Sequence, residues 1–192
     1  NIMWGITQPF VGMFADRYGS RYVMLIGVLV YILGLVTMIF STTALAFTFG
    51  AGICVGIALS CTASSMSMTV SARAVSAAKR SVTMGAISAA GSIGLVIASP
   101  LAQTLISTSG WQIALVGFIG FACVIIPSAF SAGKADKIEI DKADDVNQSL
   151  GAVVQSALGH SGYVIMALAF FVCGLQLVFI TTHLPNYLAI CG

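Results

Sequence analysis

Four polar side chains interrupt an apolar segment near the end of the chain, and their spacing is suited to binding a ligand. They are Gln176, Thr182, His183 and Asn186. Gln176 and His183 are seven positions apart, which puts them on nearly the same face of a helix. His183 can donate a hydrogen bond to a carboxylate or exchange a proton near neutral pH. We expect these residues to form a ligand-binding face; the alternative is that His183 only makes a hydrogen bond at a membrane interface.

A second group of residues combines charge with glycine in the spacing G-x-x-x-D-R-x-G-x-R. Its members are Gly12, Asp16, Arg17, Gly19 and Arg21. Gly12 would let another helix pass close by, and Gly19 permits a tight turn with positive φ. A carboxylate at a membrane interface needs a cation or the amide-rich start of a helix, so we expect Asp16 to pair with Arg73. Two alternatives stay open: Arg73 contacts a carboxylate ligand, or the charged turn only fixes topology.

Membrane helices must position both groups, because the composition leaves no soluble surface. Charged residues make up 7% of the chain and hydrophobic ones 58%, against about a quarter charged in soluble domains. Residues 22–72, 81–133 and 146–192 carry no charge, and each stretch exceeds the roughly 20 residues that cross a bilayer. The apolar runs do not alternate with polar residues, which favours helices over barrel strands. The sequence therefore predicts an all-α membrane protein.

The predicted helices follow the apolar runs. A partial helix is expected at residues 1–14, and full helices are expected near 22–41, 44–70, 82–106, 111–131 and 160–184. Because Asn1 is not an initiator and the first segment is too short to span, we interpret the chain as a fragment that starts inside a helix. Pro185 is expected to end or bend the last helix.

The charges that remain indicate how the chain is oriented. Residues 132–159 contain the one extended charged region and are predicted to be a solvated linker with room for a short surface helix. With the helices above, all eight basic residues fall on one side of the membrane, whereas the opposite connections at 41–43 and 107–110 are uncharged. Basic connections stay cytoplasmic. We therefore expect a multi-pass protein of the plasma (inner) membrane with residues 15–21, 71–81 and 132–159 in the cytoplasm.

Small residues recur at spacings that favour helix packing. One stripe comprises Gly52, Gly56, Ser60 and Ser64, and another comprises Ala86, Ala90, Gly94 and Ala98, with Gly85 and Gly91 beside it. Small residues let membrane helices approach closely. The stripes are either static contacts or smooth seams along which helices slide.

Several function classes are disfavoured. The five cysteines form no CxxC or Cys/His pattern, so we expect no metal site. No Asp or Glu falls within a predicted helix, and the sequence has no Ser/His/Asp set, HExxH motif or phosphate loop. We expect no enzymatic activity, no cofactor and no nucleic-acid partner; the lipid bilayer is the expected environment.

The spacing from Gly12 to Arg21 resembles the signature loop of the major facilitator superfamily, although Ser20 stands where many members have a basic residue. Residues 79–94 are similar to the fifth-helix signature of the monocarboxylate porter and oxalate/formate antiporter group. Gly110-Trp111 and the run 170–176 leading to 183–185 also resemble that group. The resemblance implies a chain running from the second helix to the seventh, without the first and the eighth to twelfth.

This resemblance implies domains and a function. Residues 1–131 would be an N-terminal half lacking its first helix, 132–159 the cytoplasmic linker, and 160–192 the first helix of the second half. The implied function is secondary active transport of a small organic anion, a monocarboxylate or dicarboxylate, by alternating access. The Asp16 network would latch the cytoplasmic gate. A drug or sugar transporter and a transporter-like receptor are the alternatives; the coupling proton, symport or antiport, and oligomeric state stay open.

Overall fold

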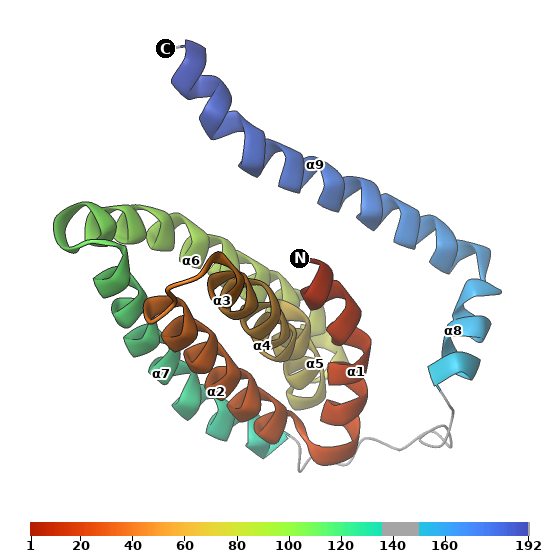
Figure 1. The fold of residues 1–192 in the computed structure, drawn as a ribbon. Coiled ribbons are helices and arrows are strands. Elements are labelled where there is room, and N and C mark those ends of the chain that lie inside the picture. The colour runs from red at the N-terminus through yellow and green to blue at the C-terminus, as the bar shows by residue number, and fades with distance from the viewer. Residues whose placement is uncertain (136–149, 192) are drawn as a thin grey trace. The chain divides into compact units, whose positions relative to one another are not determined.

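The computed structural model describes residues 1–135 and 150–191 (Figure 1). The chain divides into two compact units, Asn1–Ile140 and Asp141–Gly192. In the first unit the helices are α1 (Ile2–Tyr18), α2 (Ser20–Ile39), α3 (Ala44–Thr48), the π-helix η1 (Phe49–Cys54), α4 (Val55–Thr62), α5 (Ser64–Ala74), the 3-10 turn η2 (Ala77–Lys79), α6 (Arg80–Ser109) and α7 (Trp111–Ala135). In the second unit they are α8 (Leu150–Leu158) and α9 (Ser161–Cys191).

Five helical segments of the described chain are long and apolar enough to cross a membrane. They are Ser20–Ile39, Ala44–Ser71, Arg80–Ser109, Trp111–Gly133 and Ser161–Pro185. Their number and positions match the full helices that the sequence predicts. The predicted fold class, a partial bundle of membrane helices with a shorter helix at the start, is confirmed.

The predicted turn at 15–21 is mostly helical. Helix α1 continues through Tyr18, so that Gly19 alone separates it from α2. Asp16 consequently lies in the last turn of a helix, and the expectation that no carboxylate falls within a helix is wrong. A helix keeps its backbone hydrogen bonds internal, which explains why it extends as far as a residue that can turn the chain.

The predicted helix at 44–70 extends to Ala74 but is not continuous. Its outer part forms the π-helix η1, and a break follows at Ala63, where φ is −60° and ψ is 162°. Residues 57–70 contain no glycine or proline, so no local signal marks this break. The packing of each part against different neighbours sets it, as described below.

Helix α7 continues to Ala135, beyond its predicted end at residue 131. Residues 150–158 form α8, a short helix of the kind for which the predicted linker has room, and residues 136–149 of that linker lie outside the described residues. Of the two outcomes expected at Pro185, an end of the last helix is excluded, since α9 continues to Cys191, and a bend stays a prediction. All four prolines of the described residues lie inside helices, at Pro9, Pro100, Pro127 and Pro185. Membrane helices tolerate proline because the freed backbone groups are satisfied locally.

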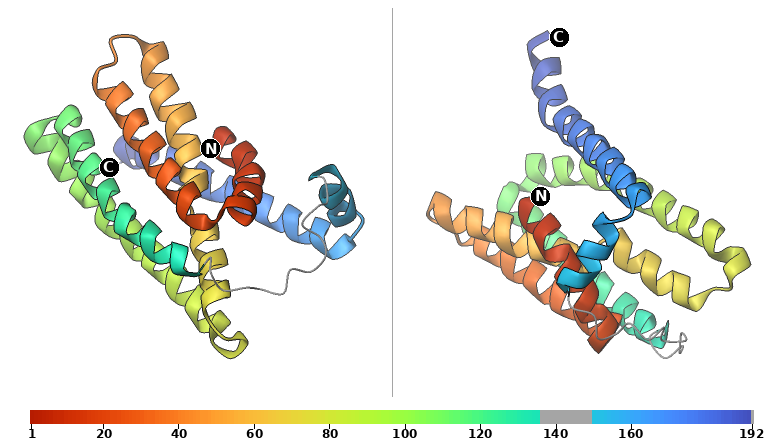
Figure 2. Two further views of the ribbon diagram at one scale, coloured as in Figure 1. Left: turned by 90° about the horizontal axis from the view of Figure 1, so that it is seen from below. Right: turned by 90° about the vertical axis from the view of Figure 1, so that its right-hand side faces the viewer.

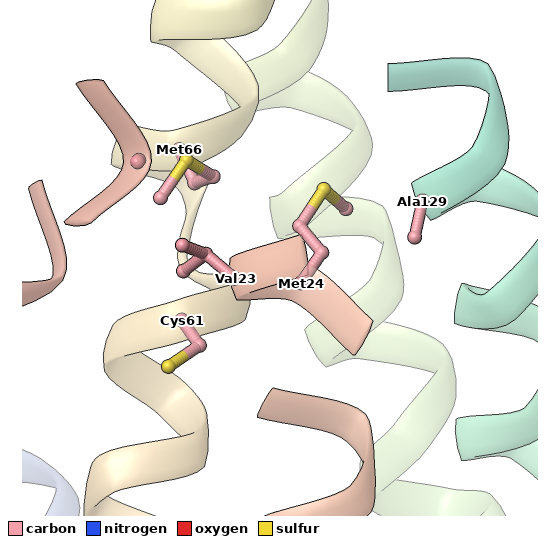
Figure 3. Packing of buried hydrophobic residues seen from close by; sticks show 6 residues of the cluster. Val23, Met24, Cys61, Met66 and Ala129 are labelled. Carbon is pink, nitrogen blue, oxygen red and sulfur yellow. The ribbon is translucent and has the colours of Figure 1, made fainter. Parts of the chain in front are cut away.

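Helix α2 lies at the centre of the first unit, between α7 and the α3–α4 segment (Figure 2). A buried cluster joins its first turns to the neighbouring helices (Figure 3). The cluster consists of Ala15, Val23, Met24, Cys61, Met66 and Ala129. These residues come from the end of α1, the start of α2, the α4–α5 junction and the end of α7. The connection between α1 and α2 therefore packs against the side chains of this cluster.

Candidate functional site

The connection between α1 and α2 turns at Gly19, whose φ is 91°. A side chain is strained at such a positive φ, so glycine is required here, as the sequence predicts. The N–H of Gly19 donates to the carbonyl oxygen of Ala15 at 2.9 Å and closes the end of α1. Ala15 and Ser20 are buried at 3% and 0% exposure, whereas Asp16 and Arg17 are exposed. Small residues of the motif thus face the bundle and its first two charges face outward.

The two arginines of the motif lie in different surroundings. The Cζ atom of Arg17 lies 5.6 Å from the ring centroid of Tyr18, its neighbour on the same helix. The Cζ atom of Arg21 lies 4.1 Å over the ring of Phe130, near the end of α7. The side chain of Arg73, the predicted partner of Asp16, is outside the described residues although its backbone belongs to α5. The pairing of Asp16 with Arg73 therefore stays a prediction.

Polar side chains join α1 to the interrupted helix that crosses it. Ser60, at 1% exposure, donates to the carbonyl oxygen of Trp4 at 2.9 Å. Its Oγ is also 2.5 Å from Oγ1 of Thr7. On the other side of the break at Ala63, Nε2 of Gln8 donates to Oγ of Ser65 at 3.0 Å. Thus α1 is bonded to both α4 and α5.

Sequence reasoning missed Thr7, Gln8 and Ser65. Two of these residues could have been found from the sequence, because Thr7 and Gln8 are polar residues within the apolar segment 1–14. Polar side chains inside a membrane bundle usually face another helix or a cavity, which makes such positions informative. Ser60 was expected only as a small residue in a packing stripe.

Glycines bring three segments into close contact. A Cβ at Gly56 would stand 2.8 Å from Cβ of Met3 in α1. A Cβ at Gly34 would stand 2.9 Å from Cβ of Cys54 and 3.0 Å from the carbonyl oxygen of Gly50. A Cβ at Gly27 would collide with Cβ of Cys61. The sequence predicts helix packing at Gly56, whereas the close approaches at Gly27, Gly34 and Gly50 are not predicted.

The other small residues named from the sequence lie in open positions within the described chain. No atom from outside their own backbone neighbourhood lies within 4 Å of a Cβ built at Gly12, Gly85, Gly91 or Gly94. Ala90 and Gly52 are exposed. Their roles in helix packing stay predictions.

The four candidate ligand-binding residues belong to α9 in the second unit. Gln176, Thr182 and His183 are exposed, and the side chain of Asn186 is outside the described residues. The ring of His183 lies 4.9 Å from the ring of Phe179 on the same helix. Their participation in binding stays a prediction.

No group of three His, Cys, Asp or Glu side chains in the described residues is placed to hold a metal ion. The five cysteines are free thiols; Cys54 and Cys61 are buried beside the glycines of α2, and the others are exposed. The candidate site in the described residues thus consists of the turn at Gly19, the aromatic contacts of Arg17 and Arg21, and hydrogen bonds between helices.

Comparison with known proteins gives the family. The model of the Major Facilitator Superfamily matches residues 2–192. Over 189 residues the chain is 26% identical to YcxA of Bacillus subtilis (strain 168), described as an uncharacterized MFS-type transporter. This match covers 95% of the chain and 45% of that protein, so the chain spans less than half the length of this relative. No solved structure matches the chain. With a family match over nearly every residue, the chain belongs to the major facilitator superfamily.

Proposed function

We propose that this chain is part of a secondary active transporter that works by alternating access. The observation that carries the proposal is the family match, which includes the signature connection at Gly12–Arg21. That connection packs against a buried cluster with residues from α2, α5 and α7. A movement of its charged residues would therefore also move these helices. Alternating access requires such rigid groups of helices, which rock around a central site. YcxA, described as a transporter of this type, supports the same interpretation.

The substrate class that we propose is a small organic anion, a monocarboxylate or dicarboxylate. The support is the similarity of residues 79–94, and of the run from 170 to 185, to the monocarboxylate porter and oxalate/formate antiporter group. Gln176 and His183 would donate hydrogen bonds to a carboxylate, with Thr182 and Asn186 beside them. The uncharged stretches contain no carboxylate, so within the proposed binding face a coupling proton would reside on His183.

For the gate, we propose that Asp16 and Arg73 pair on the cytoplasmic side of the plasma membrane. The exposure of Asp16 in the last turn of α1 supports this role, because an exposed carboxylate can be reached by a side chain of another helix. The grouping of all eight basic residues into three short stretches of the sequence, 17–21, 73–80 and 134–142, supports the orientation.

Transport by the full-length protein that contains this chain tests the proposal. Proteoliposomes should take up labelled lactate, pyruvate or oxalate in a saturable manner and show counterflow. His183→Gln and Gln176→Ala should raise KM by about tenfold, the effect of losing one charge-assisted hydrogen bond. Gln155→Ala, on an exposed face of α8, is the matched control and should leave KM unchanged.

Each other outcome points to a different protein. Uptake of a sugar or export of a drug, without carboxylate uptake, would replace the substrate class while keeping transport. Saturable binding of carboxylates without counterflow would indicate a receptor. The absence of any transported or bound compound among these classes would reject the proposal.

A further inference from the structure

Arg21 is the one charged residue of the signature motif whose side chain is partly buried. It lies in the first turn of α2 and reaches across to α7, whereas Arg17 lies beside Tyr18 of its own helix. The two arginines share a motif and a charge, but their neighbours differ. This difference assigns them different tasks.

The end of α7 is shaped to receive Arg21. Its guanidinium Cζ is centred 4.1 Å from the Phe130 ring. One turn further along α7, a Cβ at Gly133 would stand 2.9 Å from Cδ and 3.0 Å from Cβ of Arg21. Glycine at 133 thus leaves the space that the aliphatic part of the arginine occupies. Phe130 and Gly133 are three positions apart on the same face of the helix, so Arg21 lies along that face.

A guanidinium over an aromatic face is attracted by the ring quadrupole, and the attraction strengthens as the contact loses water. Phe130 is 47% exposed, so the contact is partly shielded from solvent. Met24 and Ala129, from the same two helices, belong to the buried cluster. Arg21 therefore stabilises the last turns of α7 against the start of α2.

We infer that Arg21 is a positioning residue that holds the end of α7 against the start of α2 through Phe130 and Gly133, and that Arg17 does not share this role. The inference does not depend on the identity of the substrate.

Hydrogen exchange in the full 192-residue chain tests this inference. The chain would be purified in detergent and exchange followed for the backbone amides of residues 131–135. Arg21→Met, which keeps the aliphatic stem and removes the charge, should accelerate exchange about fivefold. Phe130→Leu should also accelerate exchange, and the double variant should be no faster than Arg21→Met alone, because Phe130 acts through its contact with Arg21. Arg17→Met is the matched control and should leave these amides unchanged.

Rescue separates a cation–aromatic contact from simple packing. Phe130→Trp, which offers a better aromatic face, should retain wild-type exchange, and Arg21→Lys should fall between wild type and Arg21→Met. Gly133→Ala should displace Arg21 and abolish its coupling to Phe130. Additive effects of Arg21→Met and Phe130→Leu, or an equal effect of Arg17→Met, would overturn the inference. If Arg21→Met does not fold, the comparison of Arg21→Lys with Phe130→Trp and Phe130→Leu decides the question in the same way.

Discussion

Ser60 and Ser20 are both nearly inaccessible, yet their hydroxyl groups have different surroundings. Ser60 is bonded to the carbonyl oxygen of Trp4 and lies beside Thr7. Within the described chain the Oγ of Ser20 has no hydrogen-bond partner. A buried hydroxyl stabilises a fold only when it is bonded, because its transfer from water is otherwise uncompensated. The same substitution at the two sites should therefore have opposite consequences.

We predict that Ser60→Ala lowers the free energy of unfolding by about 0.5–2 kcal/mol, the range measured for hydrogen bonds between membrane helices. Ser20→Ala should leave it unchanged or raise it by up to about 1 kcal/mol, because an unsatisfied hydroxyl is removed. Reversible unfolding in mixed detergent micelles measures both. Equal losses at the two positions would show that size, not hydrogen bonding, matters at these sites.

Among the helices, the closest approaches depend on glycines in α2. Gly34 faces the π-helix η1, where Gly50 and Cys54 leave no room for a side chain. In α6, by comparison, Gly85 meets no atom within 4 Å in the described residues. Adding a methyl group at Gly34 thus tests a closely packed position, and adding one at Gly85 tests an open position.

Gly34→Ala should lower the free energy of unfolding by about 1–3 kcal/mol, since Cβ would press on a backbone oxygen and on Cys54. Gly85→Ala should be neutral or stabilising by up to about 1 kcal/mol, because alanine is the better helix former. Thermal unfolding in one detergent compares the two variants directly. A larger loss at Gly85 than at Gly34 would contradict the packing described for α2.

The break at Ala63 starts α5 without a capping side chain. The carbonyl oxygen of Ala63 accepts from the N–H of Met66 at 3.0 Å, and a serine at this position would add an acceptor for the same turn. We predict that Ala63→Ser raises the free energy of unfolding by about 0.5–1 kcal/mol. Ala63→Val cannot cap and is the control. If valine stabilises as much as serine, the first turn of α5 does not need a cap.

At the scale of the molecule, composition was enough to predict the number of membrane helices, because apolar length and charge are properties of whole segments. The spacing from Gly12 to Arg21 also predicted a turn at Gly19. Helix α1 extends past its predicted end at residue 14 because charge alone does not stop a helix before Gly19 turns the chain, and α9 continues past Pro185 because a membrane helix tolerates proline.

The contacts that position the candidate site could not be predicted from local pattern. The break at Ala63 has no glycine or proline near it, and the choice of Phe130 as the neighbour of Arg21 joins positions more than a hundred residues apart. Both follow from how α2, α5 and α7 pack. Thr7 and Gln8 of α1 can be recognised from the sequence as polar residues in an apolar segment. Their hydrogen-bond partners Ser60 and Ser65 cannot, because serines are common throughout the helix that follows.

The sidedness of the connections tests the central claim, a chain that crosses the membrane repeatedly with its basic connections in one compartment. In a form without native cysteines, single cysteines would be placed by Tyr18→Cys, Lys79→Cys and Lys137→Cys on the basic side. Thr42→Cys and Ser109→Cys would mark the uncharged side. In intact cells a membrane-impermeant maleimide should label only positions 42 and 109, and in inverted vesicles only positions 18, 79 and 137. Labelling of positions 18 and 79 from opposite faces would contradict the topology and the function proposed from it.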